Sequence, residues 1–434
     1  MVEKVTTAYV RLWGERIGAV AWLPSREVAA FEYLPGFLSS GLDVAPLTMP
    51  LSEARGQVFE FPSLNRQTFL GLPGLLADAL PDKFGNAIID AWLVRNGRTA
   101  ADFSPVERLC YTGSRAMGAL EFEPAMNARL ERAVPVEVAE LVGLAQQIMA
   151  ERGSLDARMG DGDGPDREAM RDILRVGTSA GGARPKAVIA MNDEGRVLSG
   201  QTAVPDGYDY WLLKFDGVSD LELGAPAGYG RIEYAYYLMA RAAGIGMSEC
   251  RLLEENGRAH FMTRRFDRQG SDKLHLQSLC GIAHYDYNTP GAYGYEQAFE
   301  VMRRLRLTKA EAVQQYRRML FNVVARNQDD HTKNIAFLMD RDGRWRLAPA
   351  FDVIYAHNPK GQWTDQHQMS INGKRDHFTR ADLLAVGESI SVSQPGEILD
   401  EIVTVVSEWP AYAGQAGVDA DRASQIGATL RLAW

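Results

Sequence analysis

The stretch that decides the fold is Asn327 to Asp352, NQDDHTKNIAFLMDRDGRWRLAPAFD. It follows an apolar helical pattern, KAEAVQQYRRMLFNVVARN, and contains two short apolar runs, IAFLMD and RWRLAP, separated by Arg-Asp-Gly. Apolar runs on either side of an Asp-Gly turn are typical of a β-hairpin. We therefore expect a polar loop held between a helix and a hairpin, where functional residues are commonly placed.

Three polar residues of this stretch have the spacing of a phosphoryl-transfer site. Asp329 precedes Asn334 by five positions, as in the catalytic loop of protein kinases, where the Asp accepts the proton of the acceptor hydroxyl and the Asn binds Mg²⁺. Asp352 adds a second carboxylate after the hairpin. Because Mg²⁺ prefers oxygen ligands and keeps several waters, Asn334 and Asp352 suffice together with phosphate oxygens. The alternative is that these residues only cap turns and a helix.

His331 lies two residues after Asp329. It could contact a phosphate group or hold the loop by a hydrogen bond. It has no histidine partner at metal-binding spacing, so we do not expect it to bind zinc.

A lysine within an apolar strand is the candidate ligand of the ATP phosphates. Lys214 lies in YWLLKFD, a poor place for an uncompensated charge. Glu233, early in the next helical pattern, could pair with it, as a strand lysine and a helix glutamate do in kinases. The alternative is a lysine that extends to solvent.

The segment GTSAGGARPK, residues 177–186, is rich in glycine. Gly181 and Gly182 would let backbone N–H groups approach anionic oxygens closely. The segment is not a Walker A sequence, because Ala183 and Arg184 stand where Lys and Ser/Thr should follow. It also lacks the GxGxxG order of a dinucleotide site.

The segment TRRFDR, residues 263–268, ends a predicted strand and should lead into the helical part of the chain. Around Arg264 and Phe266, backbone groups could bind adenine, and Asp267 could bind a ribose hydroxyl. The alternative is a solvated cluster of Arg and Asp.

Length and composition favour a soluble enzyme with more than one lobe. The chain has 434 residues, 46% of them hydrophobic, and a net charge of -9. No apolar run could span a membrane, and the start shows no secretion signal, so we expect a cytoplasmic protein. The net charge argues against a surface that broadly binds nucleic acid. The three cysteines form no CxxC pair, which predicts reduced thiols.

The order of patterns predicts three regions. Residues 1–125 should form a β-rich module, because AYVRLW and RIGAVAWL alternate in polarity around a turn. Residues 126–267 should form the rest of an N-terminal lobe, with a Gly/Asp/Pro linker at residues 153–166. Residues 268–434 should be mainly helical.

Taken together, these motifs resemble the HipA toxin kinases of type II toxin-antitoxin systems. The resemblance rests on D-x-H-x-K-N at 329–334 with Phe351-Asp352, and on FEYLPGFL, FLGLPGLLADALPDKFGN, TGSRAMGALEFEP, SAGGARPK, LLKFDG and RRFDR, in this order. It implies an α+β, two-lobed protein-kinase-like fold with a β-rich N-terminal module and a mainly α-helical C-terminal lobe. It also implies ATP and Mg²⁺ as cofactors.

The resemblance assigns roles to individual residues. Asp329 is implied to be the base, Asn334 and Asp352 to bind Mg²⁺, and Lys214 to hold ATP. Ser179 matches the serine of the glycine-rich loop that is autophosphorylated in the family, which silences the kinase; Thr178 is the alternative acceptor. The sequence departs from the family pattern at two places. Arg184-Pro185-Lys186 stands where some members have Gln-Glu-Lys after the loop, and Arg264 stands where a glutamate often precedes RFD. Both departures affect the expected nucleotide contacts.

The resemblance also implies partners. Family members are held by a helix-turn-helix antitoxin of the HipB kind, through which DNA is bound only indirectly, and their known protein substrates are aminoacyl-tRNA synthetases. Two other functions stay open at this point. One is phosphoryl transfer to a small molecule or lipid headgroup, and the other is a regulatory module without catalysis.

Overall fold

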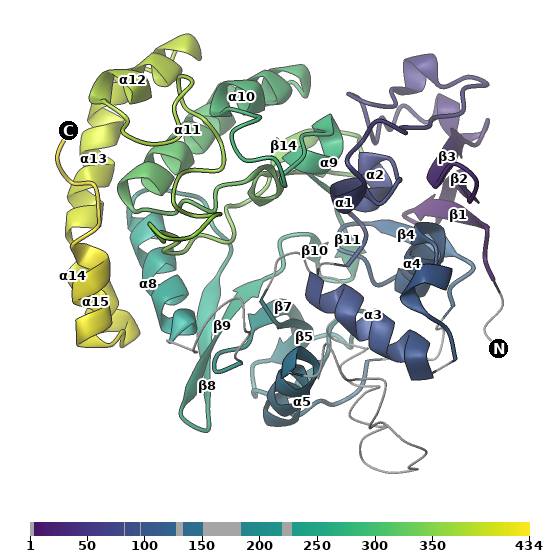
Figure 1. Ribbon diagram of the computed structural model, residues 1–434, viewed down its shortest axis with the longest axis horizontal. Helices are drawn as coiled ribbons and strands as arrows, with labels where there is room; N and C mark the ends of the chain where they lie inside the picture. Colours follow the sequence, from purple (N-terminus) through teal and green to yellow (C-terminus); the bar gives the residue numbers. More distant parts are fainter. Residues whose placement is uncertain (1–3, 82, 96, 127–132, 151–183, 219–227) are drawn as a thin grey trace. The chain divides into compact units, whose positions relative to one another are not determined.

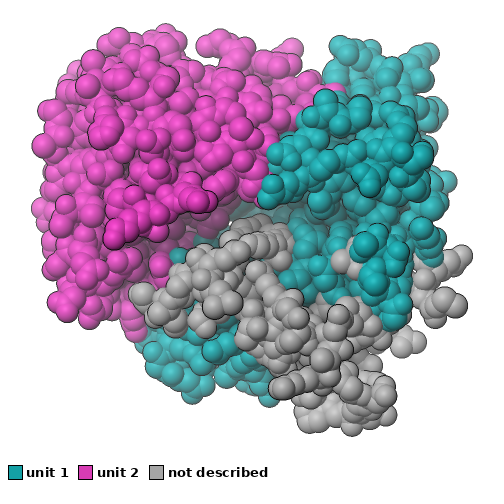
Figure 2. Space-filling view, in the orientation of Figure 1, with its two compact units in different colours: residues 1–45, 49–227, 251–276 teal, residues 46–48, 228–250, 277–434 magenta. Residues whose placement is uncertain are grey.

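The computed structural model describes residues 4–81, 83–95, 97–126, 133–150, 184–218 and 228–434. The chain divides into two compact units, coloured separately in Figure 2. The first comprises residues 1–45, 49–227 and 251–276, and the second comprises 46–48, 228–250 and 277–434. The first unit thus contains most of the two N-terminal regions expected from the sequence, and the second contains the helical region.

The first sheet of unit 1 is antiparallel, with strand order β3-β2-β1-β4. Its strands are β1 (Thr7–Leu12), β2 (Glu15–Leu23), β3 (Val28–Tyr33) and β4 (Leu120–Glu123) (Figure 1). Trp13 and Gly14, both with positive φ, make the two-residue turn between β1 and β2. Ala8, Val10 and Leu12 are buried on one face of β1, as the alternating pattern predicted.

The helices of unit 1 come mainly from the segment that Pro73 and Pro81 interrupt. We expected two short helices there, and the structure has three, because each proline ends one helical run and starts another. The helices are α1 (Arg66–Phe69), α2 (Gly74–Ala77), α3 (Lys83–Arg95), α4 (Pro105–Thr112) and α5 (Val138–Ala150).

The second sheet of unit 1 has the strand order β6-β5-β7-β9-β8. Its strands are β5 (Lys186–Asn192), β6 (Val197–Ser199), β7 (Tyr208–Lys214), β8 (Cys250–Glu255) and β9 (Arg258–Arg264), followed by the short pair β10 (Arg268–Gln269) and β11 (Asp272–Lys273). Helices α3 and α5 share a hydrophobic core with one face of this sheet, formed in part by Ile189, Trp211 and Leu213. The opposite face carries the alternate residues of the same strands.

Unit 2 is mainly helical, as expected for the C-terminal region. Its helices are α8 (Tyr229–Ala242), α9 (Leu279–Ala283), α10 (Tyr295–Arg304), α11 (Lys309–Val324), α12 (Arg380–Ser389), α13 (Pro395–Ser407), α14 (Trp409–Ala416) and α15 (Ala420–Gly427). A three-stranded sheet joins β12 (His275–Ser278), β13 (Ala336–Met339) and β14 (Trp345–Leu347). Thr308 and Glu311 form a capping box that fixes the start of α11.

Helix α8 lies in a different unit from the one its sequence position suggested. We grouped it with the strands that flank it in the chain, but Ile232, Tyr236 and Met239 belong to the core of unit 2. Its contacts with α13 and α14 explain the assignment, because an amphipathic helix joins the core that covers its apolar face.

Candidate active site

The loop that carries the candidate base is fixed at both ends by regular structure. It follows α11, and the backbone N–H of Gln328 donates to the carbonyl of Ala356 at 3.0 Å. One 3₁₀ turn, Thr332–Asn334, leads into β13, and β13 pairs with β14 as the predicted hairpin. The loop is therefore held between a helix and a hairpin.

Asp329 is the accessible carboxylate of this loop. Its side chain is 40% exposed. The amide nitrogen of Asn334 donates to the backbone carbonyl of Asp329 at 2.8 Å, which joins the two ends of the D-x-x-x-x-N motif. The indole N–H of Trp363 donates to Asp329 Oδ1 at 2.7 Å. Within the described part of the chain, no hydrogen bond reaches the other oxygen, Oδ2.

Asn334 and Asp352 line one small cavity in unit 2. Asp352 has a φ of 54°, the left-handed region that Asp tolerates better than most residues. No helix begins there, since the next described helix starts at Arg380, so Asp352 is not a helix cap. A carboxylate and an amide side chain lining one cavity form the kind of donor set that Mg²⁺ accepts.

His331 contributes to the wall of the same cavity. Its Nε2 lies 3.9 Å from Asp329 Oδ1, too far for a hydrogen bond. Its ring packs against Tyr287, with 5.3 Å between ring centroids. Its Nδ1 is buried without a hydrogen-bond partner among the described residues, so this atom could serve a ligand.

Asp330 anchors the loop, a role that sequence spacing did not indicate. Its side chain is 1% exposed and accepts hydrogen bonds from the Tyr295 hydroxyl and the Gln368 backbone N–H, each at 2.8 Å. It also contacts His367 Nδ1 at 2.8 Å. Burial opposes the charged form, but His367 and these hydrogen bonds outweigh it and hold the pKa of Asp330 below its usual value. The only signal in the sequence was a second aspartate next to the first.

Two lysines are paired in register on the face of the five-stranded sheet opposite α3 and α5. Lys214 on β7 is paired in register with Lys186 on β5 and with Phe261 on β9. Lys214 Nζ lies 5.8 Å from the Phe261 ring centroid. Lys186 is 2% exposed, an unusual environment for a lysine. The sequence had indicated Lys214, but only the strand register places Lys186 directly opposite it.

The predicted partner of Lys214, Glu233, is buried on α8 in unit 2. Lys214 belongs to unit 1. Their pairing stays a prediction.

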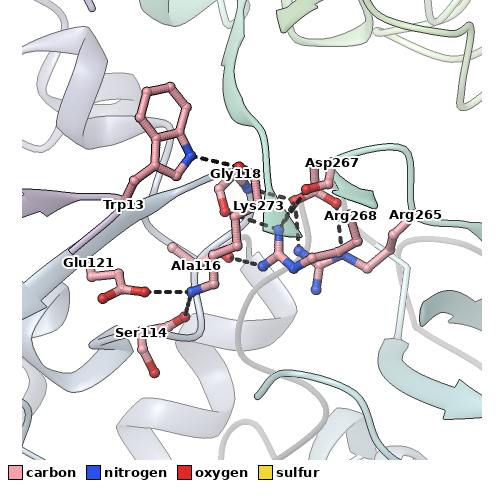
Figure 3. Close-up of polar contacts among 9 residues, drawn as sticks. All are labelled: Trp13, Ser114, Ala116, Gly118, Glu121, Arg265, Asp267, Arg268 and Lys273. Atoms are coloured by element: carbon pink, nitrogen blue, oxygen red, sulfur yellow. Dashed lines mark hydrogen bonds and ion pairs between the residues drawn. The ribbon is translucent and has the colours of Figure 1, made fainter. Parts of the chain in front are cut away.

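Asp267 occupies the centre of a buried ion cluster, shown in Figure 3. The side chain of Arg265 donates to both of its carboxylate oxygens, at 2.9 and 2.7 Å, and Arg268 donates at 2.7 Å. The backbone N–H of Gly118 donates at 2.6 Å. Although burial opposes ionisation, the two guanidinium groups keep the pKa of Asp267 well below its usual range.

This geometry bears on two expectations for Asp267. The residue is 0% exposed and both of its oxygens are engaged, so the arrangement does not favour contact with a ribose. The cluster is also not solvated, which was the alternative. Lys273 extends it, with its ammonium group bonded to the Ser114 carbonyl at 2.7 Å and to Glu121 at 2.8 Å (Figure 3). The cluster ties the loop before β4 to the end of β9.

The other residues expected to bind nucleotide are placed as follows. Arg264 is exposed and forms an ion pair with Asp209, and Phe266 is half-buried. The glycine-rich loop residues Thr178, Ser179, Gly181 and Gly182 lie outside the described residues. For the described ranges, no group of three or more His, Cys, Asp or Glu side chains is arranged to hold a metal ion. No helix in those ranges has the length and apolar character needed to cross a membrane.

The sequence matches two domain families. The HipA-like C-terminal domain matches residues 178–409, and the HipA N-terminal domain matches residues 8–123. A curated relative, named "Putative kinase Y4mE", from Sinorhizobium fredii is 28% identical over 137 residues, or 29% of this chain. The match covers 32% of that relative's length.

A solved HipA structure has a similar fold. HipA in a Shewanella oneidensis HipA, HipB and operator DNA complex aligns with a TM-score of 0.61 at 16% identity, covering 97% of this chain and 94% of that chain. The Helicobacter pylori proinflammatory kinase CtkA aligns with a TM-score of 0.32 at 12% identity, over 51% of this chain and 88% of that chain.

Proposed function

The chain belongs to the HipA family, and from that premise we propose that it is a protein kinase that transfers the γ-phosphoryl group of ATP to a serine or threonine hydroxyl. One observation carries the proposal. Asn334, which lines a cavity together with Asp352, is bonded to the backbone of the partly exposed Asp329. A proton acceptor and two oxygen ligands for a cation are thus joined in one loop and hairpin.

Asp329 is proposed to act as the base. Its Oδ2 would take the proton of the acceptor hydroxyl while the acceptor oxygen bonds to the γ-phosphorus and the bond from that phosphorus to the bridging oxygen of ADP breaks. A side chain that is 40% exposed leaves room for a hydroxyl to approach. The buried Asp330 is unsuited to this role, because its two oxygens already accept three polar contacts.

Asn334 and Asp352 are proposed to hold Mg²⁺. The Asn334 amide nitrogen is engaged by the Asp329 carbonyl, which leaves the amide oxygen as the group for a cation. When bound, the ion would neutralise charge on the phosphate oxygens. Two protein ligands are enough, because Mg²⁺ usually retains waters and takes phosphate oxygens.

Lys214 and Lys186 are proposed to hold the ATP phosphates. Lys186 and Lys214 are paired in register on β5 and β7, an arrangement that would let one polyanion contact both side chains. Both lysines are on the face opposite α3 and α5, since Trp211 and Leu213 alternate with Lys214 along β7.

Regulation and partners are proposed from the family resemblance. Ser179, or Thr178 beside it, would be phosphorylated by the kinase itself, and the added charge would repel ATP from the loop. We further propose a HipB-like antitoxin as partner, because the solved HipA neighbour forms a complex with HipB and operator DNA. The protein substrate would be a translation component such as an aminoacyl-tRNA synthetase.

The test is the intact mass of the purified chain after incubation with Mg²⁺ and ATP, followed by mapping of any modified peptide. We expect a gain of one phosphate within residues 177–186, and we expect Asp329→Ala to lower its rate by roughly 10² to 10⁴ or more. The matched control is Asp421→Ala, which removes an exposed carboxylate from α15 of the same unit.

Radiolabelled ATP with a cell lysate extends the test to other acceptors. A labelled protein band that is absent with Asp329→Ala supports a protein kinase. Label only in small molecules or lipids supports the alternative, phosphoryl transfer to a small molecule or lipid headgroup. Near-normal transfer by Asp329→Ala would contradict the site assignment.

A further inference from the structure

The segment after Asp352 contributes a side chain to the candidate base. Residues 357–368, HNPKGQWTDQHQ, contain no helix or strand. The segment is nevertheless closed on itself, because the Asn358 backbone N–H donates to the Thr364 carbonyl at 3.0 Å. Trp363 lies within this closed loop and is partly buried.

The loop that carries Trp363 is attached to the residues on either side of Asp329. The Gln368 backbone N–H donates to Asp330 Oδ1 at 2.8 Å, and the Gln368 side chain donates to the Trp363 carbonyl. The Gln328 side chain lies 3.5 Å from the Asp365 carbonyl. Gln328 and Asp330 are 0% and 4% exposed. The position of Trp363 relative to Asp329 is therefore set by buried contacts.

The contact between Trp363 and Asp329 is specific to one oxygen. The indole Nε1 donates to Oδ1 at 2.7 Å, a short distance that is typical of a charge-assisted bond. The nearest other nitrogen group recorded at Oδ1, His331 Nε2, is 3.9 Å away. Trp363 thus holds the carboxylate in one orientation.

The chemistry of the indole group suits this task. An indole N–H only donates and has no basic lone pair, so it can neither take the proton that Asp329 removes nor return one to it. A donor on Oδ1 occupies that oxygen and leaves Oδ2 as the oxygen available for an acceptor hydroxyl. A lysine or histidine in the same place would add charge or compete for the proton.

We propose that Trp363 is a positioning residue for phosphoryl transfer, which orients Asp329 through Oδ1 so that Oδ2 receives the proton of the acceptor hydroxyl. The inference rests on the proposed function. It goes beyond that function by assigning the base a partner from a segment 34 positions further along the chain.

The first test replaces Trp363 with Phe, which keeps an aromatic ring and removes the N–H. The first-order rate of self-phosphorylation at saturating Mg²⁺-ATP should fall about 10- to 100-fold, the range expected for a hydrogen bond to a charged group. The calorimetric Kd of a non-hydrolysable ATP analogue should change less than about twofold, because the indole contacts the base and not the nucleotide.

Two further variants test whether the N–H group of Trp363 itself matters. β-(3-Benzothienyl)alanine at position 363 replaces the N–H with sulfur at nearly constant shape, and it should reproduce the loss seen with Trp363→Phe. Trp434→Phe removes another indole N–H, which donates to the Arg431 carbonyl at 2.9 Å in the same unit, and should leave the rate unchanged.

A double-mutant cycle separates positioning from a general structural role. If Trp363 acts through the base, Trp363→Phe should slow the wild type but add no further loss to Asp329→Asn. Equal losses in both backgrounds would overturn the inference, as would a wild-type rate in Trp363→Phe. A wild type that transfers no phosphoryl group in any assay would overturn the proposed function, and this inference with it.

Discussion

Asp329 and Asp330 are neighbours in the sequence, but their surroundings differ completely. Asp329 is 40% exposed, whereas the side chain of Asp330 is 1% exposed and bonded to His367, Tyr295 and the backbone of Gln368. A buried carboxylate requires such partners, since its desolvation would otherwise make the charged form too costly. One aspartate can therefore react while the other holds the loop.

Asp330 should make the stability of the protein depend on pH in the acid range. Its pKa is lower in the folded state than the unfolded value of about 3.9, because its contacts outweigh the effect of burial. This stabilisation is fully present above the unfolded pKa and is lost as pH falls through the folded pKa. Below about pH 4, the unfolding free energy of the wild type should therefore fall, with Asp330 contributing up to about 1.4 kcal/mol per pH unit. Asp330→Asn removes this contribution and should show a smaller fall.

Urea unfolding at several pH values between 2 and 7 measures this effect. Asp421→Asn, which changes an exposed aspartate on α15, is the control and should keep the wild-type pH dependence. An identical acid slope for Asp330→Asn and the wild type would contradict the role of the buried network.

Asp352 combines a proposed metal ligand with an unusual backbone conformation. At a φ of 54°, Asn is tolerated nearly as well as Asp, but Ala costs roughly 1–2 kcal/mol. Asp352→Asn and Asp352→Ala should both lower Mg²⁺-dependent transfer by about 10² or more. Only Asp352→Ala should also lower the unfolding free energy clearly, which thermal and urea unfolding can measure. Equal stability of the two variants would argue against backbone strain.

At the scale of elements, the Asp267 cluster connects a loop to a strand end within unit 1. Arg268 donates to the carbonyls of Gly118 and Ala116, at 3.0 and 3.3 Å, in addition to its bond to Asp267. A Cβ atom at Gly118, which has a φ of 78°, would lie 3.0 Å from the Leu276 backbone. The loop before β4 therefore packs closely on the chain that follows β11.

Asp267→Ala should destabilise the protein by about 3–5 kcal/mol, because it leaves Arg265 and Arg268 buried without their common anion. Urea unfolding measures the loss. Asp206→Ala, at an exposed aspartate of the same unit, should stay within about 0.5 kcal/mol of the wild type.

Asp267→Ala also decides between a structural and a nucleotide-binding role for Asp267. If the Asp267→Ala protein is stable and its Kd for an ATP analogue rises tenfold or more, the result would support the ribose contact that the sequence suggested. Loss of stability with little change in that Kd, measured below the unfolding temperature, would support the cluster.

At the scale of the whole molecule, the proposed phosphate lysines and the proposed base belong to different compact units. A nucleotide that binds only the folded state stabilises it by mass action, by about 2.7 kcal/mol at a concentration of 100 times Kd. A non-hydrolysable ATP analogue with Mg²⁺ should therefore raise the melting temperature. Lys214→Ala and Lys186→Ala should each remove most of this rise.

Thermal unfolding with and without the analogue provides the measurement. Lys4→Ala, at an exposed lysine of the first unit, is the matched control and should retain the full shift. A full shift in both lysine variants would contradict the proposal that Lys186 and Lys214 hold phosphates.

The sequence by itself determined the features that depend on neighbouring residues. The Asp-Gly turn with its flanking apolar runs predicted the hairpin β13–β14, and the helical pattern before it predicted α11. The D-x-x-x-x-N spacing singled out Asp329 and Asn334, and the structure joins these two residues by a hydrogen bond. Local turn chemistry, helix capping and short loops follow from residues a few positions apart, so a single sequence contains them.

Only the tertiary structure decided which groups are buried and which distant segments meet. It enclosed Asp267 between two arginines, assigned α8 to the second core, and brought Trp363 to Asp329. It also set Lys186 opposite Lys214 through strand register. These relations depend on desolvation and on contacts between residues far apart in the chain, and neither is encoded in the spacing of a local motif.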